Sequence, residues 1–425
     1  MGVKVAVIGA GSTYTPELVE GLTDLADRLP VAELSLCDID DARLEVVGGL
    51  AQRILRRRDW PGRLQMTESR ETALEGADYV VIQLRVGGQA ARRLDETIPL
   101  RFGCIGQETT GPGGLAKALR TVPLVLEIAG DAVRRSAPDA WILDFTNPVG
   151  IVSQALLDRG FRAIGLCNTA IGFQRRLAAM LGVDWENLQL EHVGLNHLTW
   201  ERAARVGGGD MLPDLLATRA DEIADELGMP GDLLRLLGAI PSYYLRYYYM
   251  TSTVLEEERD GREPRADEVA RIESQLLDLY CDPELDHKPE LLEQRGGAFY
   301  SLAAARLMAS LESDTGDVQV VNCRNQGALP GLPDDAVVEV PARIDRAGAH
   351  PLPQSPLAPE LLGLVQAAKA YERLAVEAAT SGDRAVALKA LLANPLVSQY
   401  QVAAPLLDAL LAANRDQLPL FFPAG

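Results

Sequence analysis

The chain opens with a short apolar run that ends in a glycine turn and leads into a helix-forming segment. Val3–Ile8 has the composition of a buried strand, and residues 17–29 have the pattern of a helix, with Thr15 as its N-cap and Pro16 in its first turn. A glycine turn between a strand and a helix typically opens a parallel β-α-β unit that binds a dinucleotide. The turn residues that we expect to contact the cofactor are Gly9, Gly11, Ser12 and Thr13.

Strand-like and helix-like segments continue to alternate over the first part of the chain. Further strands are expected at 34–37, 79–83 and 141–144, and further helices at 43–58 and 115–134. Such alternation predicts an α/β fold with a Rossmann-type, doubly wound parallel sheet. After residue 168 the pattern loosens into a mixture, with helices expected at 169–181, 214–227, 267–279 and 297–311, and strands at 188–193, 198–204, 318–321 and 337–340. We therefore expect a nucleotide-binding domain at 1–167 and a mixed α/β domain at 168–425, with a proline-rich surface segment at 347–359 and helices from residue 361 to 415.

The glycine turn departs from the usual dinucleotide fingerprint at one position. Tyr14 stands where the third glycine of GxGxxG would be, so the match rests on its context between a strand and a helix. Asp38 closes the second expected strand, where a carboxylate binds the ribose diol and favours NAD over NADP. The alternative is that the glycines serve the turn alone.

Charge and composition exclude several classes of partner. The net charge of −19 disfavours nucleic acid and anionic membranes. No apolar stretch approaches the roughly 20 residues of a membrane helix. Five scattered cysteines without a CxxC spacing argue against a disulfide framework, and the reducing cytoplasm is the expected compartment.

A soft thiolate and an imidazole follow strand-like runs and form a plausible divalent-metal pair. Cys167 comes after the run 162–166, and His197 comes shortly after the run 190–195. Taken singly, each residue is more often a buried core residue than a ligand. Polar neighbours at expected strand ends favour the ligand interpretation: Asn147, Asn168 and Asn196.

Three further segments carry candidate chemistry. Five tyrosines lie within residues 243–249, where an amphipathic core helix is the plain alternative, but one tyrosine beside a metal and a cationic cofactor could act as a general base. Arg85 and Arg92 flank a glycine pair, and their guanidinium groups match phosphate or sugar oxygens, although surface arginines are common. Residues 106–114 form a second glycine-rich stretch that we expect near the cofactor or substrate.

Together these segments resemble glycoside hydrolase family 4, the NAD- and metal-dependent glycosidases, and in particular its 6-phospho-β-glucosidases. The similarity spans nearly the whole chain, and the C-terminal part thereby resembles the lactate/malate dehydrogenase superfamily. It is carried by Val7-Ile-Gly-Ala-Gly-Ser-Thr-Tyr-Thr-Pro16, the segment 85–96, Ile105-Gly-Gln-Glu-Thr-Thr-Gly111, Phe145-Thr-Asn-Pro148, Gly165-Leu-Cys-Asn168, Gly194-Leu-Asn-His197 and Tyr244-Leu-Arg-Tyr-Tyr248.

The resemblance implies an unusual route to hydrolysis, which the family follows in place of the two-carboxylate scheme. NAD⁺ removes hydride from the carbon bearing the 3-hydroxyl, and Mn²⁺ or another divalent ion on Cys167 and His197 polarises the sugar oxygens. Tyr244 matches the base that removes the proton at carbon two; the aglycone then leaves, water adds, and reduction restores NAD⁺. The substrate would be a phosphorylated β-glucoside such as cellobiose 6-phosphate, and a homodimer or homotetramer is expected.

The resemblance also assigns substrate contacts residue by residue. Arg92, Asn147 and Arg265 match substrate-contacting positions. Asn168 stands where α-specific members have aspartate, which favours a β-linked substrate and leaves the general acid unassigned. Tyr244 is preceded by Pro-Ser-Tyr in place of the expected Asn-Pro, so a neighbouring tyrosine competes for the base role.

Two rival interpretations remain at this point. A plain NAD-dependent dehydrogenase of the malate or lactate type would share the fold and the single histidine, but it would accumulate NADH and would not need Cys167. A non-catalytic NAD-sensing protein would leave the cysteine, histidine and tyrosine segments as ordinary core.

Overall fold

A computed structural model describes residues 2–261, 263–296 and 299–423. Within these ranges thirteen strands form one continuous sheet. Its central path runs β10-β8-β7-β12-β11-β6-β5-β4-β1-β2-β3, with β13 paired to β12 and β9 to β8. The strands are β1 (Val3–Ile8), β2 (Val31–Cys37), β3 (Arg63–Thr67), β4 (Tyr79–Ile82), β5 (Trp141–Asp144), β6 (Ala163–Gly165), β7 (Leu188–Leu195), β8 (Leu198–Val206), β9 (Gly209–Asp210), β10 (Ile240–Pro241), β11 (Asp317–Arg324), β12 (Val337–Asp345) and β13 (Gly348–Pro351).

The N-terminal six strands make the parallel half of the sheet. Their order, β3-β2-β1-β4-β5-β6, is that of a doubly wound dinucleotide fold, as the alternation of segments predicts. Strand β4 is buried along its whole length, because helices cover both faces of a parallel sheet. The carboxyl ends of these strands therefore meet at one edge, where ligands bind in such folds.

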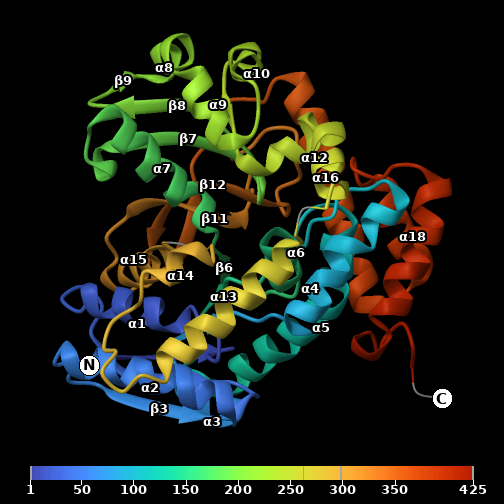
Figure 1. The fold of residues 1–425 in the computed structure, drawn as a ribbon. Coiled ribbons are helices and arrows are strands. Elements are labelled where there is room, and N and C mark those ends of the chain that lie inside the picture. Colours follow the sequence, from blue (N-terminus) through green and yellow to red (C-terminus); the bar gives the residue numbers. More distant parts are fainter. Residues whose placement is uncertain (1, 262, 297–298, 424–425) are drawn as a thin grey trace.

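Helices cover the sheet in two layers (Figure 1). On one face α1 and α2 pack with α13 and α15; on the other α5 and α6 pack with α16. The helices are α1 (Thr15–Asp24), α2 (Asp41–Arg57), α3 (Arg70–Leu74), α4 (Gly88–Thr97), α5 (Gly111–Arg135), α6 (Val149–Asp158), α7 (Asn168–Leu181), α8 (Leu212–Thr218), α9 (Ala220–Leu227), α10 (Gly231–Leu237), α11 (Arg246–Tyr249), α12 (Thr251–Arg259), α13 (Arg265–Tyr280), α14 (Leu291–Gln294), α15 (Tyr300–Ser313), α16 (Pro359–Ser381), α17 (Arg384–Ala393) and α18 (Tyr400–Ala413), with short 3₁₀ turns η1 (Pro99–Phe102), η2 (Trp185–Asn187), η3 (Tyr243–Leu245) and η4 (Arg415–Gln417). Among the helices in the described ranges, none is long and apolar enough to cross a membrane.

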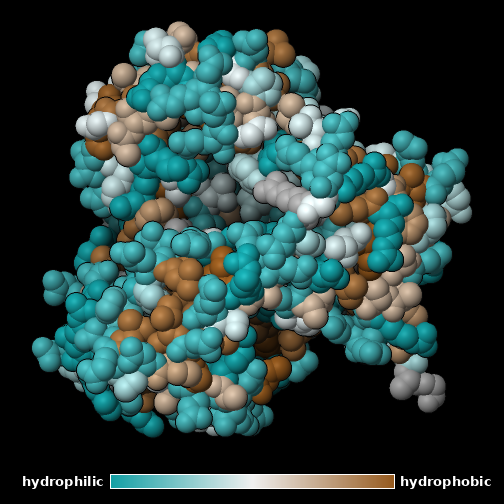
Figure 2. All heavy atoms as spheres, viewed as in Figure 1, coloured by the Kyte–Doolittle hydropathy of each residue, from teal (hydrophilic) through white to brown (hydrophobic). Residues whose placement is uncertain are grey.

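Antiparallel strands from the second half of the chain extend the sheet beyond β6. Strand β11 lies between β6 and β12, and β12 lies between β11 and β7. Figure 1 shows β7, β8 and β9 with helices α7–α10 as the upper part of the molecule, above the nucleotide-binding half. Figure 2 shows a hollow on this face between these two parts, with mainly hydrophilic residues around it.

Several local predictions need correction. Thr15 is the first residue of α1 and not its N-cap; its hydroxyl donates to the Ala10 carbonyl and accepts from Gln83, so it fastens the turn to the sheet. The helix expected at 214–227 is two helices, α8 and α9, and α1 ends at Asp24. The tyrosine-rich segment is the turn η3 followed by one turn of helix, α11. The predicted start of a helix at residue 297 lies outside the described residues, and the proposed division at residue 167 stays a prediction.

Candidate active site

The glycine turn after β1 is built around the Asp38 carboxylate. Gly9 has a φ of +91°, and a Cβ there would lie 2.5 Å from the Gln83 carbonyl oxygen. The Gly11 amide donates to Asp38 Oδ2 at 2.7 Å, and a Cβ on Gly11 would lie 2.9 Å from the Asp38 Cγ. Both glycines are therefore required by close approach, and the turn forms a cradle at the start of α1 that suits a pyrophosphate.

A single cavity of about 1210 Å³ begins at this cradle and reaches the second half of the chain. Ten of the residues singled out from the sequence line it: Gly9, Gly11, Ser12, Asp38, Arg85, Arg92, Asn147, Asn168, Tyr244 and Arg265. Thr13 is fully buried and is not among the lining residues, nor are Cys167 and His197, which lie buried behind the wall. The structure thus places the dinucleotide turn, the predicted arginines and Tyr244 around one cavity.

His197 is held as a neutral imidazole with one ring nitrogen free. The Thr109 hydroxyl lies 3.0 Å from His197 Nδ1 and donates its one hydrogen to Gln107 Oε1 at 2.8 Å. It must therefore accept from Nδ1–H, which leaves the lone pair on Nε2. Burial lowers the pKa of His197 to about 4, so the ring stays neutral near pH 7. A neutral imidazole with a free Nε2 is the form that binds metal.

Cys167 supplies the second candidate ligand. It precedes α7, and its thiol donates to Thr169 Oγ1 at 3.2 Å. Burial, together with the nearby Glu339 carboxylate, raises the pKa of the thiol to about 12, against the lowering effect of hydrogen bonds with Thr169 and Asn196. No set of three or more histidine, cysteine or carboxylate side chains is arranged for a metal within the described ranges. A cation here would accordingly need oxygen ligands from amides, water or substrate.

Tyr244 lies directly against the imidazole. The two rings are parallel within 9° and their centroids are 3.6 Å apart. Tyr243, the neighbouring tyrosine, instead accepts a hydrogen bond from Arg246 Nη1 at 2.9 Å. Burial raises the pKa of Tyr244 well above 10, Cys167 raises it too, and Arg92 lowers it. The geometry favours Tyr244 over Tyr243 as the reactive tyrosine.

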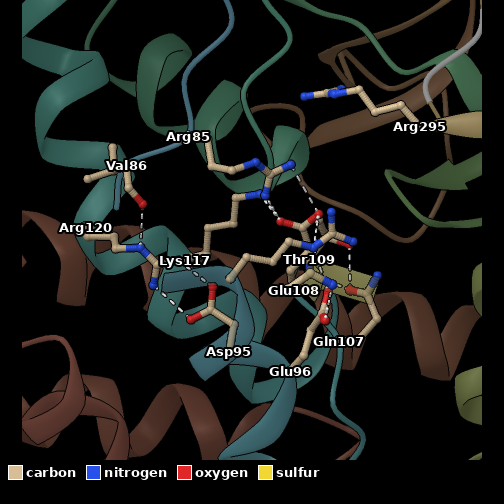
Figure 3. Close-up of polar contacts among 12 residues, drawn as sticks. Arg85, Val86, Asp95, Glu96, Gln107, Glu108, Thr109, Lys117, Arg120 and Arg295 are labelled. Atoms are coloured by element: carbon tan, nitrogen blue, oxygen red, sulfur yellow. Dashed lines mark hydrogen bonds and ion pairs between the residues drawn. The ribbon is translucent and has the colours of Figure 1, made fainter. Parts of the chain in front are cut away.

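The two predicted arginines meet at Glu108, a carboxylate that the sequence interpretation did not single out. Figure 3 shows Glu108 beside Arg85 and Lys117. Glu108 pairs with Arg85, with Arg92 Nε at 3.3 Å and with Lys117 Nζ at 2.5 Å. Although burial opposes it, these three cations hold the pKa of Glu108 well below its usual range. We call Glu108, Arg85, Arg92 and Lys117 the Glu108 cluster. It fixes both guanidinium groups at the cavity wall, where Glu96 also pairs with Arg92 Nε at 2.6 Å.

The remaining predicted residues differ in how far their polar groups are already engaged by the protein. Asn147 follows β5, and its Oδ1 is buried without a hydrogen-bond partner. Asn168 begins α7 beside Cys167. Arg265 begins α13 and donates to the carbonyls of Gln294 and Arg295 while pairing with Glu268, so the protein already occupies much of its guanidinium.

Several lining or supporting residues were missed by the sequence interpretation. Glu108 and Thr109 lie in the glycine-rich stretch 106–114, which was expected near the ligands but without assigned residues. Lys117 was missed because it lies within the predicted helix 115–134. Burial and the nearby arginines lower its pKa to about 7, against the opposing effect of Glu108. A lysine among glycines, alanines and leucines was the available signal.

The fold and site define a dinucleotide-binding α/β enzyme class. The chain resembles the malate dehydrogenase of Cryptosporidium parvum with a TM-score of 0.55 at 16% identity, over 90% of this chain and 100% of that one, a likeness of fold alone. The model described as Family 4 glycosyl hydrolase matches residues 4–183, and that of its C-terminal domain matches residues 192–397. The chain belongs to family 4 of the glycosyl hydrolases, which confirms the resemblance and the predicted fold class.

Two relatives illustrate the similarity. A protein of Bacillus subtilis named a probable 6-phospho-beta-glucosidase is 42% identical, over 99% of this chain and 98% of its own. The 6-phospho-beta-glucosidase of Thermotoga maritima, solved with NAD and glucose-6-phosphate, has a TM-score of 0.92 at 37% identity, covering 98% of this chain and 99% of that one. The same enzyme has also been solved with manganese, NAD⁺ and glucose-6-phosphate, with a TM-score of 0.90 at 36% identity over 98% and 99% of the two chains.

Proposed function

We propose that the chain is a 6-phospho-β-glucosidase that cleaves 6-phosphorylated β-glucosides such as cellobiose 6-phosphate. The observation that carries this proposal is the stacking of Tyr244, which lines the cavity that begins at the dinucleotide turn, on His197 behind the cavity wall. A plain dehydrogenase needs no tyrosine base against a metal-binding histidine. Family membership and the names of the relatives support the same choice.

The cofactor of the proposed reaction is NAD. Gly9, Gly11 and Ser12 would hold its pyrophosphate at the start of α1, and the Asp38 carboxylate would bind its ribose, whereas Thr13 is buried and does not line the cavity. When bound, NAD⁺ accepts a hydride from the sugar and later returns it, so that hydrolysis consumes no cofactor. Asp38 receives amide hydrogens from Gly11 and Asp40, which fixes the carboxylate at the cavity edge.

A divalent ion, with Mn²⁺ as our choice, would be held by Cys167 and His197. The free Nε2 of a neutral histidine and a thiol that ionises on binding fit such an ion, and the unpartnered Asn147 Oδ1 lies at the same cavity. When bound, the ion supplies Lewis-acid polarisation of the sugar oxygens and positive charge beside Tyr244.

The chain's own residues then position and deprotonate the substrate. After its phenol has lost its own proton to water, Tyr244 would take the proton from carbon two at its phenolic oxygen, and its place against His197 fixes the direction of approach. Asn147, Asn168, Arg85, Arg92 and Arg265 contact the phosphorylated sugar, with Arg85 and Arg92 held rigid by Glu108. Asn168, which cannot act as a carboxylic acid beside Cys167, favours the β-linked substrate.

We also infer the setting in which the enzyme works. A phosphorylated sugar and NAD are metabolites of the cytoplasm, and we place the protein there. A homodimer or homotetramer is proposed from family resemblance.

The test is release of p-nitrophenol from its β-glucoside 6-phosphate, followed together with NADH absorbance. We expect release that requires both NAD⁺ and Mn²⁺, with no accumulation of NADH. Omission of each cofactor is the control. Steady NADH formation without cleavage would replace this proposal with the dehydrogenase.

A further inference from the structure

One row of residues crosses five strands directly beneath the candidate metal pair. Backbone pairing aligns Gly165 of β6 with Asn322 of β11, Asn322 with Glu339 of β12, Glu339 with Gly194 of β7, and Gly194 with Thr199 of β8. Residues in register on neighbouring strands share one face of a sheet. We call this set the cross-sheet row. Cys167 and His197 lie two and three residues beyond its two glycines, so the row sets the position of both.

Glu339 is the centre of the row and is fully engaged. Its Oε2 accepts from Asn196 Nδ2 at 2.7 Å and from Asn322 Nδ2 at 2.8 Å, and its Oε1 accepts from His192 Nε2 at 3.0 Å. The carboxylate is almost completely buried. Although burial opposes ionisation, the His192 contact and the two amides keep the pKa of Glu339 below its usual value.

The connection from Glu339 to the metal pair runs through Asn196. The side chain of Asn196 is bonded to Glu339 and also to the Cys167 thiol. The next residue, His197, has a φ of +62°, a conformation that L side chains seldom adopt without support from their surroundings. By holding Asn196, the buried Glu339 carboxylate therefore fixes both the Cys167 thiol and the turn that carries His197.

We propose that Glu339 is a positioning residue that sets the Cys167–His197 pair for metal binding by holding the Asn196 amide. The inference rests on the proposed function for the identity of the site, and goes beyond it by assigning a residue that touches neither substrate nor cofactor.

The decisive measurement is the affinity for Mn²⁺ alone, read by electron paramagnetic resonance of the free ion during titration of metal-free protein. Glu339→Gln keeps the shape but cannot accept from three donors at once. We expect its Mn²⁺ dissociation constant to rise about 10- to 100-fold, as for other residues that orient metal ligands. NAD⁺ affinity, measured by fluorescence titration, should stay at the wild-type value and reports an intact fold.

Glu201→Gln is the matched control. Glu201 is also buried and accepts from the other nitrogen of the same His192 at 2.6 Å, but within the described part of the chain it makes no hydrogen bond to Asn196. We expect its Mn²⁺ affinity to remain within twofold of wild type. Equal losses of Mn²⁺ affinity in Glu339→Gln and Glu201→Gln would show that the two buried carboxylates are merely structural, and would overturn the proposal.

Asn196→Ala tests the connection in a protein that keeps the His192 and Asn322 contacts of Glu339. We expect it to weaken Mn²⁺ binding, and addition of Glu339→Gln to weaken it no further, because both changes remove one connection. If the double variant lost Mn²⁺ affinity by the product of the two single losses, the proposal would be overturned. Wild-type Mn²⁺ affinity in Glu339→Gln would also overturn it. Absence of Mn²⁺ binding by the wild type would instead overturn the metal site of the proposed function, and this inference with it.

Discussion

Tyr243 and Tyr244 are chemically identical neighbours in different surroundings. Tyr244 lies flat on His197, whereas Tyr243 is bonded to Arg246. We expect Tyr244→Phe to lower kcat by about 10²- to 10⁴-fold, the usual contribution of a general base, with the melting temperature unchanged. Release of p-nitrophenol measures this effect. Tyr243→Phe is the control and should keep most activity; the reverse ranking would move the base to Tyr243.

His192 couples stability to pH. Burial alone would lower its pKa, but Glu201 and Glu339 on its two nitrogens outweigh burial and raise the pKa to about 10. Because the unfolded value is about 6.5, the native state binds the extra proton between these values. The contribution of His192 is thus complete below pH 6.5 and is lost as the pH rises towards 10.

This coupling predicts the slope of the free energy of unfolding against pH. In urea denaturation between pH 7 and 10 the wild type should lose stability more steeply than His192→Gln, by up to about 1.4 kcal/mol per pH unit. His287→Gln, at an exposed histidine beside Asp286, should keep the wild-type slope. Parallel slopes in wild type and His192→Gln would contradict the charged state of His192.

At the scale of single residues, local sequence pattern can nominate candidate metal ligands but not the residues that support them. Cys167 and His197 follow strands and belong to rare residue types, so local pattern identified them as candidates. Glu108 and Glu339 are two of many carboxylates, and their roles depend on partners far away in sequence. Nothing local distinguishes Glu339 until β12 is placed beside β7.

Among the elements, strands β7 and β12 depend on a glycine. Gly194 has a φ of +146°, and a Cβ there would overlap the Leu198 carbonyl oxygen. We expect Gly194→Ala to cost about 1–3 kcal/mol, the usual effect of overpacking, and to weaken Mn²⁺ binding by moving the turn that carries His197. Thermal denaturation measures the first effect.

Gly363 provides the opposite control for that substitution. It is exposed within α16, and a Cβ there would meet nothing within 4 Å. Gly363→Ala should therefore stabilise the protein by about 0.5–1 kcal/mol through helix propensity. A stabilising Gly194→Ala would show that the turn is looser than its geometry indicates.

Element types were easier to predict than their ends. Buried strands and amphipathic helices repeat with clear periods, which explains the agreement for β1, β5 and α7. Thr15 was misassigned because its hydroxyl bonds to Ala10 and Gln83, and this contact is invisible in a linear sequence. The tyrosine-rich segment forms only a turn and a short helix because its rings line the cavity and pack against three separate apolar clusters.

For the whole molecule, the C-terminal helices complete the N-terminal half. Leu119 and Val122 of α5 share an apolar cluster with Tyr371 of α16 and with Leu407 of α18. Arg120 of α5 also bonds to Asn414 beyond α18. We expect a fragment of residues 1–167 to show no cooperative thermal transition, because it exposes this face and the edge of β6. Circular dichroism on heating tests it, with the full chain as reference.

The order of the complete sheet lay beyond the reach of local pattern. Alternating segments predicted the parallel half, whose neighbours are close in sequence. The insertion of β11 and β12 between β6 and β7 reverses the chain order, and one pair, Asn322 with Gly165, joins the two halves of the sheet. Cooperative folding of the isolated fragment would show that this junction is dispensable.

That insertion has a consequence for the order in which the protein comes into being on the ribosome. Cys167 and His197 are synthesised early, but the strands that carry them meet through β11 and β12, which emerge more than a hundred residues later. Until residue 345 has left the exit tunnel, β6 and β7 are not joined in one sheet, and the Cys167 thiol and the His197 imidazole are not held together. An incomplete nascent chain therefore lacks the sheet that brings the two candidate ligands together, and we expect metal binding only by a protein whose translation is nearly complete.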